Sequence, residues 1–360
     1  MTIVLLILGF ILLVLGAEIL VRGASKLAVI VRISPLVIGL TVVAFGTSSP
    51  ELAVSLKAAF ANSSDISLGN VIGSNIFNIL FVLGISAIIL PLFVSQQLVR
   101  LDVPLMIIAS VLVLILGLDG NIGRFDGILL FAGIIVYIVF LIKKSRKENK
   151  EIVEEYTQEY GNDIIKPKRK IPMFIVLIIA GLLLLVLGSH LLVDSSVIIA
   201  RYFNVSELLI GLTIIAVGTS LPELATSVIA TINGERDIAV GNVIGSNIFN
   251  LLAILGLAGL LSPNGINVSE TALSFDLPFM IVVAVACLPI FFTGYIISRW
   301  EGGLFLAYYV VYIIYLYLAA VSHKILPVYN IALIIFIVPI TAITLIVLTY
   351  RSIKTNKLKT

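Results

Sequence analysis

The feature that most constrains the fold of this chain is a polar segment that occurs twice. The first copy begins at Gly39 and reads GLTVVAFGTSSPELAVSLKAAFANSSDISLGNVIGSNIFNILFVLG; the second begins at Gly211 and reads GLTIIAVGTSLPELATSVIATINGERDIAVGNVIGSNIFNLLAILG. The copies align without a gap at an offset of 172 residues and are identical at 28 of 46 positions. The identities include Gly, Thr, Ser, Pro, Asn and one Glu per copy, and a hydrocarbon environment disfavours the polar ones. The repeat therefore predicts one site built from both copies.

Composition places the repeat in a membrane protein. The chain is 60% hydrophobic and 12% charged, with a mean hydropathy of +1.19. Several apolar runs reach the roughly 20 residues that cross a bilayer as a helix, and they are continuous rather than alternating, which excludes a β-barrel. We expect an all-α polytopic membrane protein surrounded by the lipid bilayer, with no nucleic acid and no obligate protein partner. One cysteine and two histidines exclude an internal disulfide and a His-rich metal site.

The hydropathy pattern predicts eleven transmembrane helices. They cover residues 3–21, 34–61, 67–92, 102–119, 125–142, 172–193, 206–232, 239–261, 273–293, 302–321 and 329–350. The duplication extends beyond the polar segment, because Asp102-Val-Pro-Leu-Met matches Asp276-Leu-Pro-Phe-Met. We expect four regions: a first five-helix repeat (1–142), a charged cytoplasmic linker (143–171), a second five-helix repeat (172–321), and an extra helix with a basic cytoplasmic tail (322–360). An odd number of helices inverts the second repeat, as in many secondary transporters.

Charge placement predicts the orientation. With the N-terminus outside, 19 of the 23 Lys and Arg residues lie on the cytoplasmic side, as positively charged loops prefer. We therefore expect a multi-pass protein of the cell membrane with its C-terminus inside. The mixed-charge run 143–171 is interpreted as a solvated linker with some helix. A regulatory cation site on its glutamates is the alternative, although the run lacks the pattern of a calcium loop.

The two Glu residues of the repeat predict the sign of the substrate. Glu51 and Glu223 fall about midway along their spans, where an ionisable side chain is usually functional. Two carboxylates in a dry site repel each other unless a cation joins them. Pro50 and Pro222 lack a backbone donor, and we expect nearby carbonyl groups to lose their helix partners and become available to a cation. Those carbonyls belong to Ala44, Thr47, Ala216 and Thr219.

The second half of each copy, GNVIGSNIFN, supplies neutral oxygens. Ser74 and Asn78 are four residues apart and share a helix face, as do Ser246 and Asn250. Oxygen ligands alone suit hard cations such as Ca²⁺, Na⁺ or Mg²⁺. For any single serine, bonding back to its own helix is an equal alternative. The remaining residues have structural interpretations: amides that tie helices together (Asn70, Asn75, Asn242, Asn247), glycines for close helix contact (Gly69, Gly73, Gly241, Gly245) and helix caps (Asp102, Asp276).

These motifs resemble the two α-repeats of the sodium/calcium exchangers within the cation/calcium antiporter superfamily. The resemblance covers both five-helix halves but not the eleventh helix, since the family core has ten. It implies cation sites between helices 2, 3, 7 and 8, with helices 1 and 6 sliding across this core. Glu51 and Glu223 would bind Ca²⁺ and share in Na⁺ binding, and Asn78 and Asn250 would line the centre. Na⁺ sites would be completed by the Thr47, Thr219, Ala44 and Ala216 carbonyls and by Ser48, Ser74, Ser220 and Ser246.

The sequence and the resemblance together favour Na⁺-driven Ca²⁺ antiport by alternating access, with no enzymatic activity and no cofactor beyond the transported ions. Potassium-dependent relatives carry Asp at the position of Asn250, so we expect K⁺-independent exchange. Three Na⁺ per Ca²⁺ would make transport electrogenic. An antiporter of H⁺ and Ca²⁺, or of another divalent cation such as Mg²⁺ or Mn²⁺, stays open, although the repeat motif of proton-coupled relatives is absent. A passive channel is a weaker alternative, because it needs a continuous pore.

Overall fold

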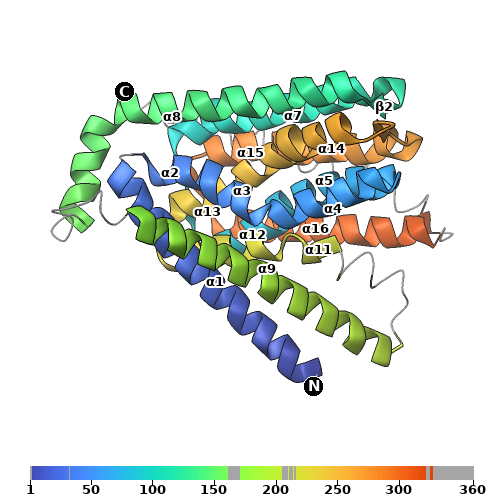
Figure 1. The fold of residues 1–360 in the computed structure, drawn as a ribbon, viewed down its shortest axis with the longest axis horizontal. Coiled ribbons are helices and arrows are strands. Elements are labelled where there is room, and N and C mark those ends of the chain that lie inside the picture. Colours follow the sequence, from blue (N-terminus) through green and yellow to red (C-terminus); the bar gives the residue numbers. More distant parts are fainter. Residues whose placement is uncertain are drawn as a thin grey trace.

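The fold is a bundle of long helices, seen in a computed structural model (Figure 1). The structure describes residues 2–31, 33–160, 171–204, 210, 214, 216–321 and 325–326, without the side chains of residues 146–160 and 216. Its α-helices are α1 (Thr2–Val31), α2 (Pro35–Ile38), α3 (Ala44–Thr47), α4 (Ser49–Phe60), α5 (Ser64–Phe77), α6 (Gly84–Ile89), α7 (Val103–Leu116), α8 (Arg124–Tyr160), α9 (Ile171–Tyr202), α11 (Ala216–Gly218), α12 (Leu221–Ile232), α13 (Arg236–Ile248), α14 (Leu255–Leu261), α15 (Leu277–Phe292) and α16 (Arg299–Ala320).

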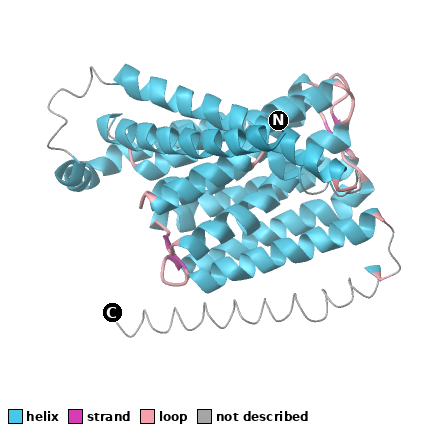
Figure 2. Cartoon of the chain, turned by 90° about the horizontal axis from the view of Figure 1, so that it is seen from below, coloured by secondary structure: helices cyan, strands magenta, loops and turns pink. Residues whose placement is uncertain are grey.

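Short irregular helical segments and strands connect these helices. The π-helical segments are η1 (Gly39–Val43), η2 (Asn78–Leu83), η3 (Leu98–Asp102), η8 (Phe249–Ile254) and η9 (Ala272–Asp276), and η4 (Gly117–Asp119) is a 3₁₀ turn. Strand β1 (Leu92–Phe93) pairs antiparallel with β4 (Ile296–Ile297), and β2 (Asn121–Ile122) with β3 (Ile266–Asn267). Figure 2 shows the two pairs at opposite ends of the bundle. Each pair joins a loop of the first half to a loop of the second.

Eight helical segments of the described chain are long and apolar enough to cross a membrane, or up to nine if the bent pair Pro35–Thr47 and Ser49–Phe60 is one span. These nine correspond to nine of the eleven predicted spans. Of the predicted span 206–232, the described part contains the shorter apolar helix Leu221–Ile232. The predicted span 329–350 lies outside the described residues. The bend of 47° falls at Ser48, just before Pro50, where the ring of proline disrupts the preceding turn.

The first and sixth predicted spans end too early. The predictions 3–21 and 172–193 stop near charged residues, whereas α1 continues to Val31 and α9 to Tyr202. In α1, Glu18 and Arg22 form an ion pair one turn apart, so the charges that end the apolar run are compatible with a continuing helix. Likewise α8 continues to Tyr160, well into the predicted linker.

Helices α1 and α9 pack against each other through glycines over most of their length. A Cβ atom at Gly9 would lie 2.9 Å from the carbonyl oxygen of Gly188, and one at Gly16 would lie 2.8 Å from that of Gly181. The pairing of 9 with 188 and of 16 with 181 makes the two helices antiparallel. They lie together along the lower edge of the bundle in Figure 1. Small residues at such crossings let two backbones approach closely.

The polar repeat lies at the centre of the bundle. Within the apolar window of each span, 72% of Ser64–Ile89 and 89% of Arg236–Leu261 is buried, against 28% for α1 and for α9. These two buried spans, α5–η2–α6 and α13–η8–α14, carry the two GNVIGSNIFN motifs. The spans that carry the polar motifs are therefore shielded from lipid by the rest of the bundle, as polar groups in a membrane require.

Asp102 and Asp276 do not cap helices, so this interpretation of the sequence is wrong. Each ends a π-helical segment that runs directly into an α-helix, with helical backbone angles and no side-chain cap hydrogen bond. The preceding turn already satisfies the N–H groups that a cap would serve. The Asp102 carboxylate instead accepts hydrogen bonds from the Tyr137 hydroxyl at 2.9 Å and from the Gln97 amide at 3.2 Å.

Candidate cation-binding site

The two repeated Glu residues occupy equivalent places at the start of two helices. Glu51 lies in the first turn of α4 and Glu223 in the first turn of α12, each directly after the proline of its motif. Both side chains are 0% exposed. The first turn of a helix favours a negative charge, because the peptide dipoles place partial positive charge there. Among the described residues, neither carboxylate has an ion-pair partner.

Serines of one copy hold the carboxylate of the other. The Ser220 hydroxyl donates to Glu51 Oε1 at 2.8 Å, and the Ser48 hydroxyl donates to Glu223 Oε1 at 2.8 Å. Each bond joins residues about 170 positions apart in the chain, and each is the counterpart of the other at the repeat offset. The two copies of the motif therefore meet at a single place, as the duplication predicted.

Ser74 and Ser246 extend this network from the neighbouring helices. The Ser246 hydroxyl donates to Glu223 Oε1 at 3.3 Å, and the hydroxyl groups of Ser74 and Ser220 are hydrogen-bonded at 3.0 Å. Both serines are buried. Three of the four predicted serines therefore hydrogen-bond directly to a carboxylate, and the fourth, Ser74, hydrogen-bonds to Ser220, which does so.

Asn78 and Asn250 lie in the same region, and among the described residues each hydrogen-bonds through its amide nitrogen alone. Asn78 Nδ2 donates to Asn247 Oδ1 at 3.1 Å, and Asn250 Nδ2 donates to Asn75 Oδ1 at 3.4 Å. Asn247 also donates to the backbone carbonyl of Asn75 at 3.2 Å. Asn75 and Asn247 therefore tie α5 to α13 and orient the amides of Asn78 and Asn250, which confirms their predicted role as ties between helices.

Four buried oxygens of this region have no hydrogen-bond donor among the described residues. They are Glu51 Oε2, Glu223 Oε2, Asn78 Oδ1 and Asn250 Oδ1. The other three buried side-chain oxygens without a partner are single hydroxyl groups, of Ser67, Ser86 and Thr226. Buried acceptors without donors are costly and rare in proteins. Two carboxylate and two amide oxygens gathered from both repeats are a donor set for a hard cation.

The predicted carbonyl ligands divide into two groups. The Ala44 carbonyl accepts a hydrogen bond from the Ser48 backbone N–H at 3.0 Å. The expectation that this carbonyl lacks a helix partner is therefore wrong, because the carbonyl four residues before Pro50 belongs to Gly46. The carbonyl roles of Thr47, Thr219 and Ala216 stay predictions.

The threonine hydroxyls connect the two repeats. Thr47 donates to Asn242 Oδ1 at 3.0 Å, and Thr219 donates to Asn70 Oδ1 at 3.3 Å. These bonds are again counterparts at the repeat offset. They place each threonine beside an asparagine that holds the backbone of a glutamate.

Two serines that sequence reasoning missed complete this support. Asn70 Nδ2 donates to the Glu51 carbonyl at 3.2 Å and to the Ser55 hydroxyl at 2.9 Å. In the other repeat, Asn242 Nδ2 donates to the Glu223 carbonyl at 3.4 Å and to the Ser227 hydroxyl at 2.9 Å. The signal was available, since each Ser follows its Glu by four residues in both copies. Hydrogen bonds of this kind fix the orientation of the groups that would bind an ion.

Two methionines also have a supporting role that the sequence analysis did not assign to them. Asn75 Nδ2 lies 3.5 Å from Met280 Sδ, and Asn247 Nδ2 lies 3.6 Å from Met106 Sδ. Both methionines belong to the repeated Asp-x-Pro-x-Met sequence. A thioether is a weak acceptor that satisfies an amide inside an apolar region.

The glycines of the repeat differ between the copies. A Cβ at Gly241 would lie 2.9 Å from the Leu36 carbonyl oxygen, and one at Gly245 would lie 2.7 Å from that of Leu40. The close helix contact predicted for these two glycines is confirmed. A Cβ at Gly69 or at Gly73 meets no described atom within 4 Å. For this copy the described residues do not support the predicted contact.

Replacement of Asn75 by Leu is expected to lower the free energy of unfolding by about 1–3 kcal/mol, because it leaves the buried Asn250 amide without its acceptor. Thermal unfolding followed by circular dichroism measures the change. The matched control is Asn233→Leu, since Asn233 is exposed and bonds to Glu18 at the surface. Equal losses in both variants would contradict a structural role for the buried amide network.

Known proteins are similar to this chain in sequence and in fold. The sequence model of a family described as "Sodium/calcium exchanger protein" matches residues 1–143 and 173–318. The chain is 40% identical to the inner membrane protein YrbG of Escherichia coli K12, over 70% of the chain and 77% of that protein. It is 32% identical to the sodium/calcium exchanger MaX1 of Methanosarcina acetivorans, over 87% of the chain and 97% of that protein. A solved structure of the sodium–calcium exchanger NCX_Mj superposes with a TM-score of 0.73 and 32% identity, covering 86% of this chain and 97% of that one.

Proposed function

Because the chain belongs to the sodium/calcium exchanger protein family, we propose that it is a secondary active antiporter that exchanges Na⁺ for Ca²⁺ by alternating access. The observation that carries this proposal is the set of four buried oxygens without a donor in the described part of the chain, two of them from Glu51 and Glu223. Among the described residues no group of three or more His, Cys, Asp or Glu side chains could hold a metal ion. A substrate site of two carboxylates and neutral oxygens fits Ca²⁺ and Na⁺, which both prefer oxygen.

The proposed ligands follow from these contacts. Ca²⁺ is bound by Glu51 and Glu223, with the Asn78 and Asn250 amide oxygens beside it. Na⁺ shares the carboxylates and uses hydroxyl and carbonyl oxygens around them. This larger set comprises Ser48, Ser74, Ser220, Ser246, Thr47, Thr219 and Ala216. The Ala44 carbonyl also belongs to this set, because the backbone N–H of Ser48 occupies only one of its two lone pairs.

We propose electrogenic, K⁺-independent exchange. One Ca²⁺ neutralises the two carboxylates, as two Na⁺ would, so a third Na⁺ moves one net positive charge. Asn78 and Asn250 at the two central positions are uncharged amides. The empty site therefore has a charge of −2, from its two carboxylates, rather than −3. A third carboxylate would offer a further cation such as K⁺ a place to bind.

We also propose the arrangement of the full chain. Two inverted five-helix repeats, 1–142 and 172–321, flank the cytoplasmic linker 143–171, and region 322–360 adds an eleventh helix and a basic tail. The protein lies in the cell membrane with its N-terminus outside, acts on ions without enzymatic activity, and needs no protein partner. The proposed orientation rests on the excess of Lys and Arg in the segments assigned to the cytoplasm.

The decisive experiment measures uptake of radioactive Ca²⁺ into proteoliposomes loaded with Na⁺. We expect uptake when Na⁺ is inside and absent outside, and none when K⁺ replaces the internal Na⁺. Because three Na⁺ leave for each Ca²⁺ that enters, an inside-positive potential should accelerate uptake. Rates that do not respond to the potential would overturn electrogenic exchange.

Proton coupling and passive flow have different signatures in the same vesicles. Uptake that ignores the Na⁺ gradient and follows a pH gradient would establish H⁺/Ca²⁺ antiport instead. A channel would conduct Ca²⁺ down its own gradient without any counter-ion and without saturation. Competition by unlabelled Mg²⁺ or Mn²⁺ then tests which divalent cation the site prefers.

A further inference from the structure

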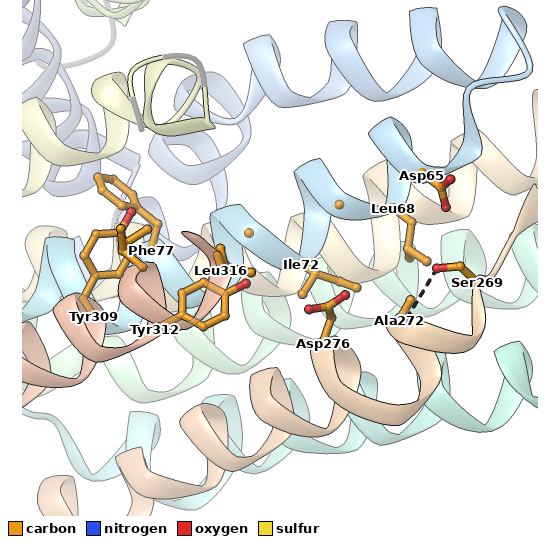
Figure 3. Close-up of a pocket in the computed structure, with 13 residues that line it drawn as sticks. Asp65, Leu68, Ile72, Phe77, Ser269, Ala272, Asp276, Tyr309, Tyr312 and Leu316 are labelled. Atoms are coloured by element: carbon orange, nitrogen blue, oxygen red, sulfur yellow. Dashed lines mark hydrogen bonds between the residues drawn. The ribbon is translucent and has the colours of Figure 1, made fainter. Parts of the chain in front are cut away.

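A cavity outside the central site lies along helix α5, and its mostly apolar lining contains two aspartates. Its volume is about 350 Å³, and it is lined by α5, the junction of η9 with α15, and α16 (Figure 3). Along α5 it extends from Asp65, in the first turn, to Phe77, the last residue of the helix. Twelve residues of helix correspond to about 18 Å. The cavity therefore runs from the exposed start of α5 to the depth of Asn78.

The polar groups of this cavity are acidic and hydroxylic. Two aspartates line it, Asp65 at the exposed end and Asp276 further in, together with the Ser269, Tyr309 and Tyr312 side chains. The 13 lining residues include no Lys, Arg or His. In the described part of the chain, the Asp276 carboxylate has neither a hydrogen bond nor an ion pair. A half-buried carboxylate without a donor or counter-charge is unfavourable unless a cation or water joins it.

Tyr312 adds an independent sign of a ligand. Its side chain is only 7% exposed, and its hydroxyl has no hydrogen-bond partner among the described residues. In Figure 3 the Tyr312 hydroxyl points along the cavity toward Asp276. The hydroxyl of a buried tyrosine usually finds a partner, so this one is available to a group inside the cavity.

The other repeat shows the same pair in a satisfied form. Asp102 and Tyr137 are the counterparts of Asp276 and Tyr312, at offsets of 174 and 175, and they hydrogen-bond at 2.9 Å. Asp102 is 0% exposed and also accepts from Gln97, whose counterpart is Thr271. One copy of the pair is therefore closed on itself, whereas the copy in the cavity has neither donor among the residues that the structure describes.

We propose that the cavity is a second cation site, in which Asp276 and the Tyr312 hydroxyl, with Asp65 at the entrance, bind Ca²⁺ on its way to Glu51 and Glu223. The cavity wall on α5 is formed by residues 65, 68, 69, 72, 73 and 77, which repeat at helical spacing. Gly73 and Phe77 directly precede the proposed ligands Ser74 and Asn78. The inner end of the cavity therefore lies at the same level of this helix as Ser74 and Asn78, which point to a neighbouring face.

The ligand chemistry selects a hard cation. Carboxylate and hydroxyl oxygens are ligands for Ca²⁺, and a cavity lined by one sign of charge raises the local concentration of the opposite ion. Asp65 and Asp276 are the two carboxylates among the lining residues, which include no third charged group. Such a site binds Ca²⁺ weakly and releases it readily. This role rests on the proposed function, since it gives the Ca²⁺ a destination.

The transport test compares Asp276→Asn with Asp119→Asn. Asp119 is exposed, and its loop carries β2, which pairs with β3 just before Ser269. We expect Asp276→Asn to raise the Ca²⁺ KM about tenfold at an unchanged maximal rate, because local enrichment is lost while the central site is intact. Asp119→Asn should retain the wild-type KM. An unchanged KM in Asp276→Asn, with normal exchange by the wild type, would overturn the second site and leave the proposed function standing.

A binding test needs no transport. Tb³⁺ replaces Ca²⁺ in oxygen sites and luminesces when a nearby tyrosine absorbs light, and the cavity is lined by Tyr309 and Tyr312. In the double variant Glu51→Gln, Glu223→Gln, we expect tyrosine-sensitised luminescence that Ca²⁺ displaces. Adding Asp276→Asn should remove that Ca²⁺-displaceable component, whereas adding Asp119→Asn should not. A component that persists without Asp276 would refute the site even if exchange itself is confirmed.

Discussion

Glu51→Gln and Glu223→Gln are each expected to abolish Na⁺-dependent Ca²⁺ uptake, with a loss of at least about 100-fold. Substitution of groups that merely support metal ligands typically costs 10–100-fold, and these two carboxylates are the proposed charged ligands themselves. Each substitution removes one of the two negative charges of the empty site. The remaining charge of −1 no longer balances the +2 charge of Ca²⁺. The amide keeps an oxygen that can accept from Ser220 or Ser48, which preserves the shape of the site.

Thermal unfolding with and without Ca²⁺ distinguishes a loss of ion binding from a loss of folding in these two variants. Both side chains are 0% exposed, and removing a buried unpaired charge should not lower stability without ligand. A ligand that binds only the folded state raises its stability by mass action. Wild-type protein should therefore unfold at a higher temperature in Ca²⁺, and the two variants should lose this shift. Glu270→Gln, at an exposed position, is the control and should behave as wild type. Normal exchange in both site variants would refute the proposed ligands.

Gly245→Ala is expected to destabilise the fold by about 2 kcal/mol, whereas Gly73→Ala, at the equivalent position of the other copy, is expected to be tolerated. A Cβ at Gly245 would lie 2.7 Å from Leu40 O and 2.8 Å from Ala44 Cβ. Forcing extra atoms into a packed contact costs about 1–3 kcal/mol. A Cβ at Gly73 meets no described atom within 4 Å, and Ala favours a helix by up to about 1 kcal/mol over Gly.

Thermal unfolding of the two variants, followed by circular dichroism in one detergent, measures this difference directly. Because the motif is GNVIGSNIFN in both copies, the pair shares its local sequence and differs only in what packs against it. A larger Gly245→Val effect, with Gly73→Val still tolerated, would show that side-chain volume is the cause. Similar losses at both positions would mean that the two glycines are packed alike.

Much of the candidate site could be predicted from the sequence. Glu51 and Glu223 are carboxylates in a chain of membrane helices, and their duplication predicted that the two copies meet. The reciprocal bonds of Ser48 and Ser220 confirm this meeting. Asn75 and Asn247 were predicted as ties between helices, and both make such bonds. These predictions were confirmed because the polarity of a side chain, and its repetition in the second copy, can be read directly from the sequence.

Other features could not be predicted in this way. The apolar run of α1 ends near Glu18, but the helix continues to Val31, because an ion pair with Arg22 keeps the charges compatible with helix. Asp102 resembled a cap by its position at the start of a span, yet it accepts from Tyr137, 35 residues away. In both cases the deciding partner is a specific side chain, which hydropathy does not identify.

The sequence by itself determined the class of the protein, the duplication, and which residues bring carboxylates and amides into the membrane, because hydropathy and spacing belong to each segment alone. Only the tertiary structure decided which oxygens remain without donors. Glu51 Oε1 accepts from Ser220, whereas Oε2 has no donor among the described residues, a distinction that depends on an atom 169 residues away. It likewise decided that Gly245 is in contact and that Asp276, unlike Asp102, faces a cavity. Identical or equivalent residues differ in these respects because contacts and hydrogen bonds are made between segments far apart in the chain.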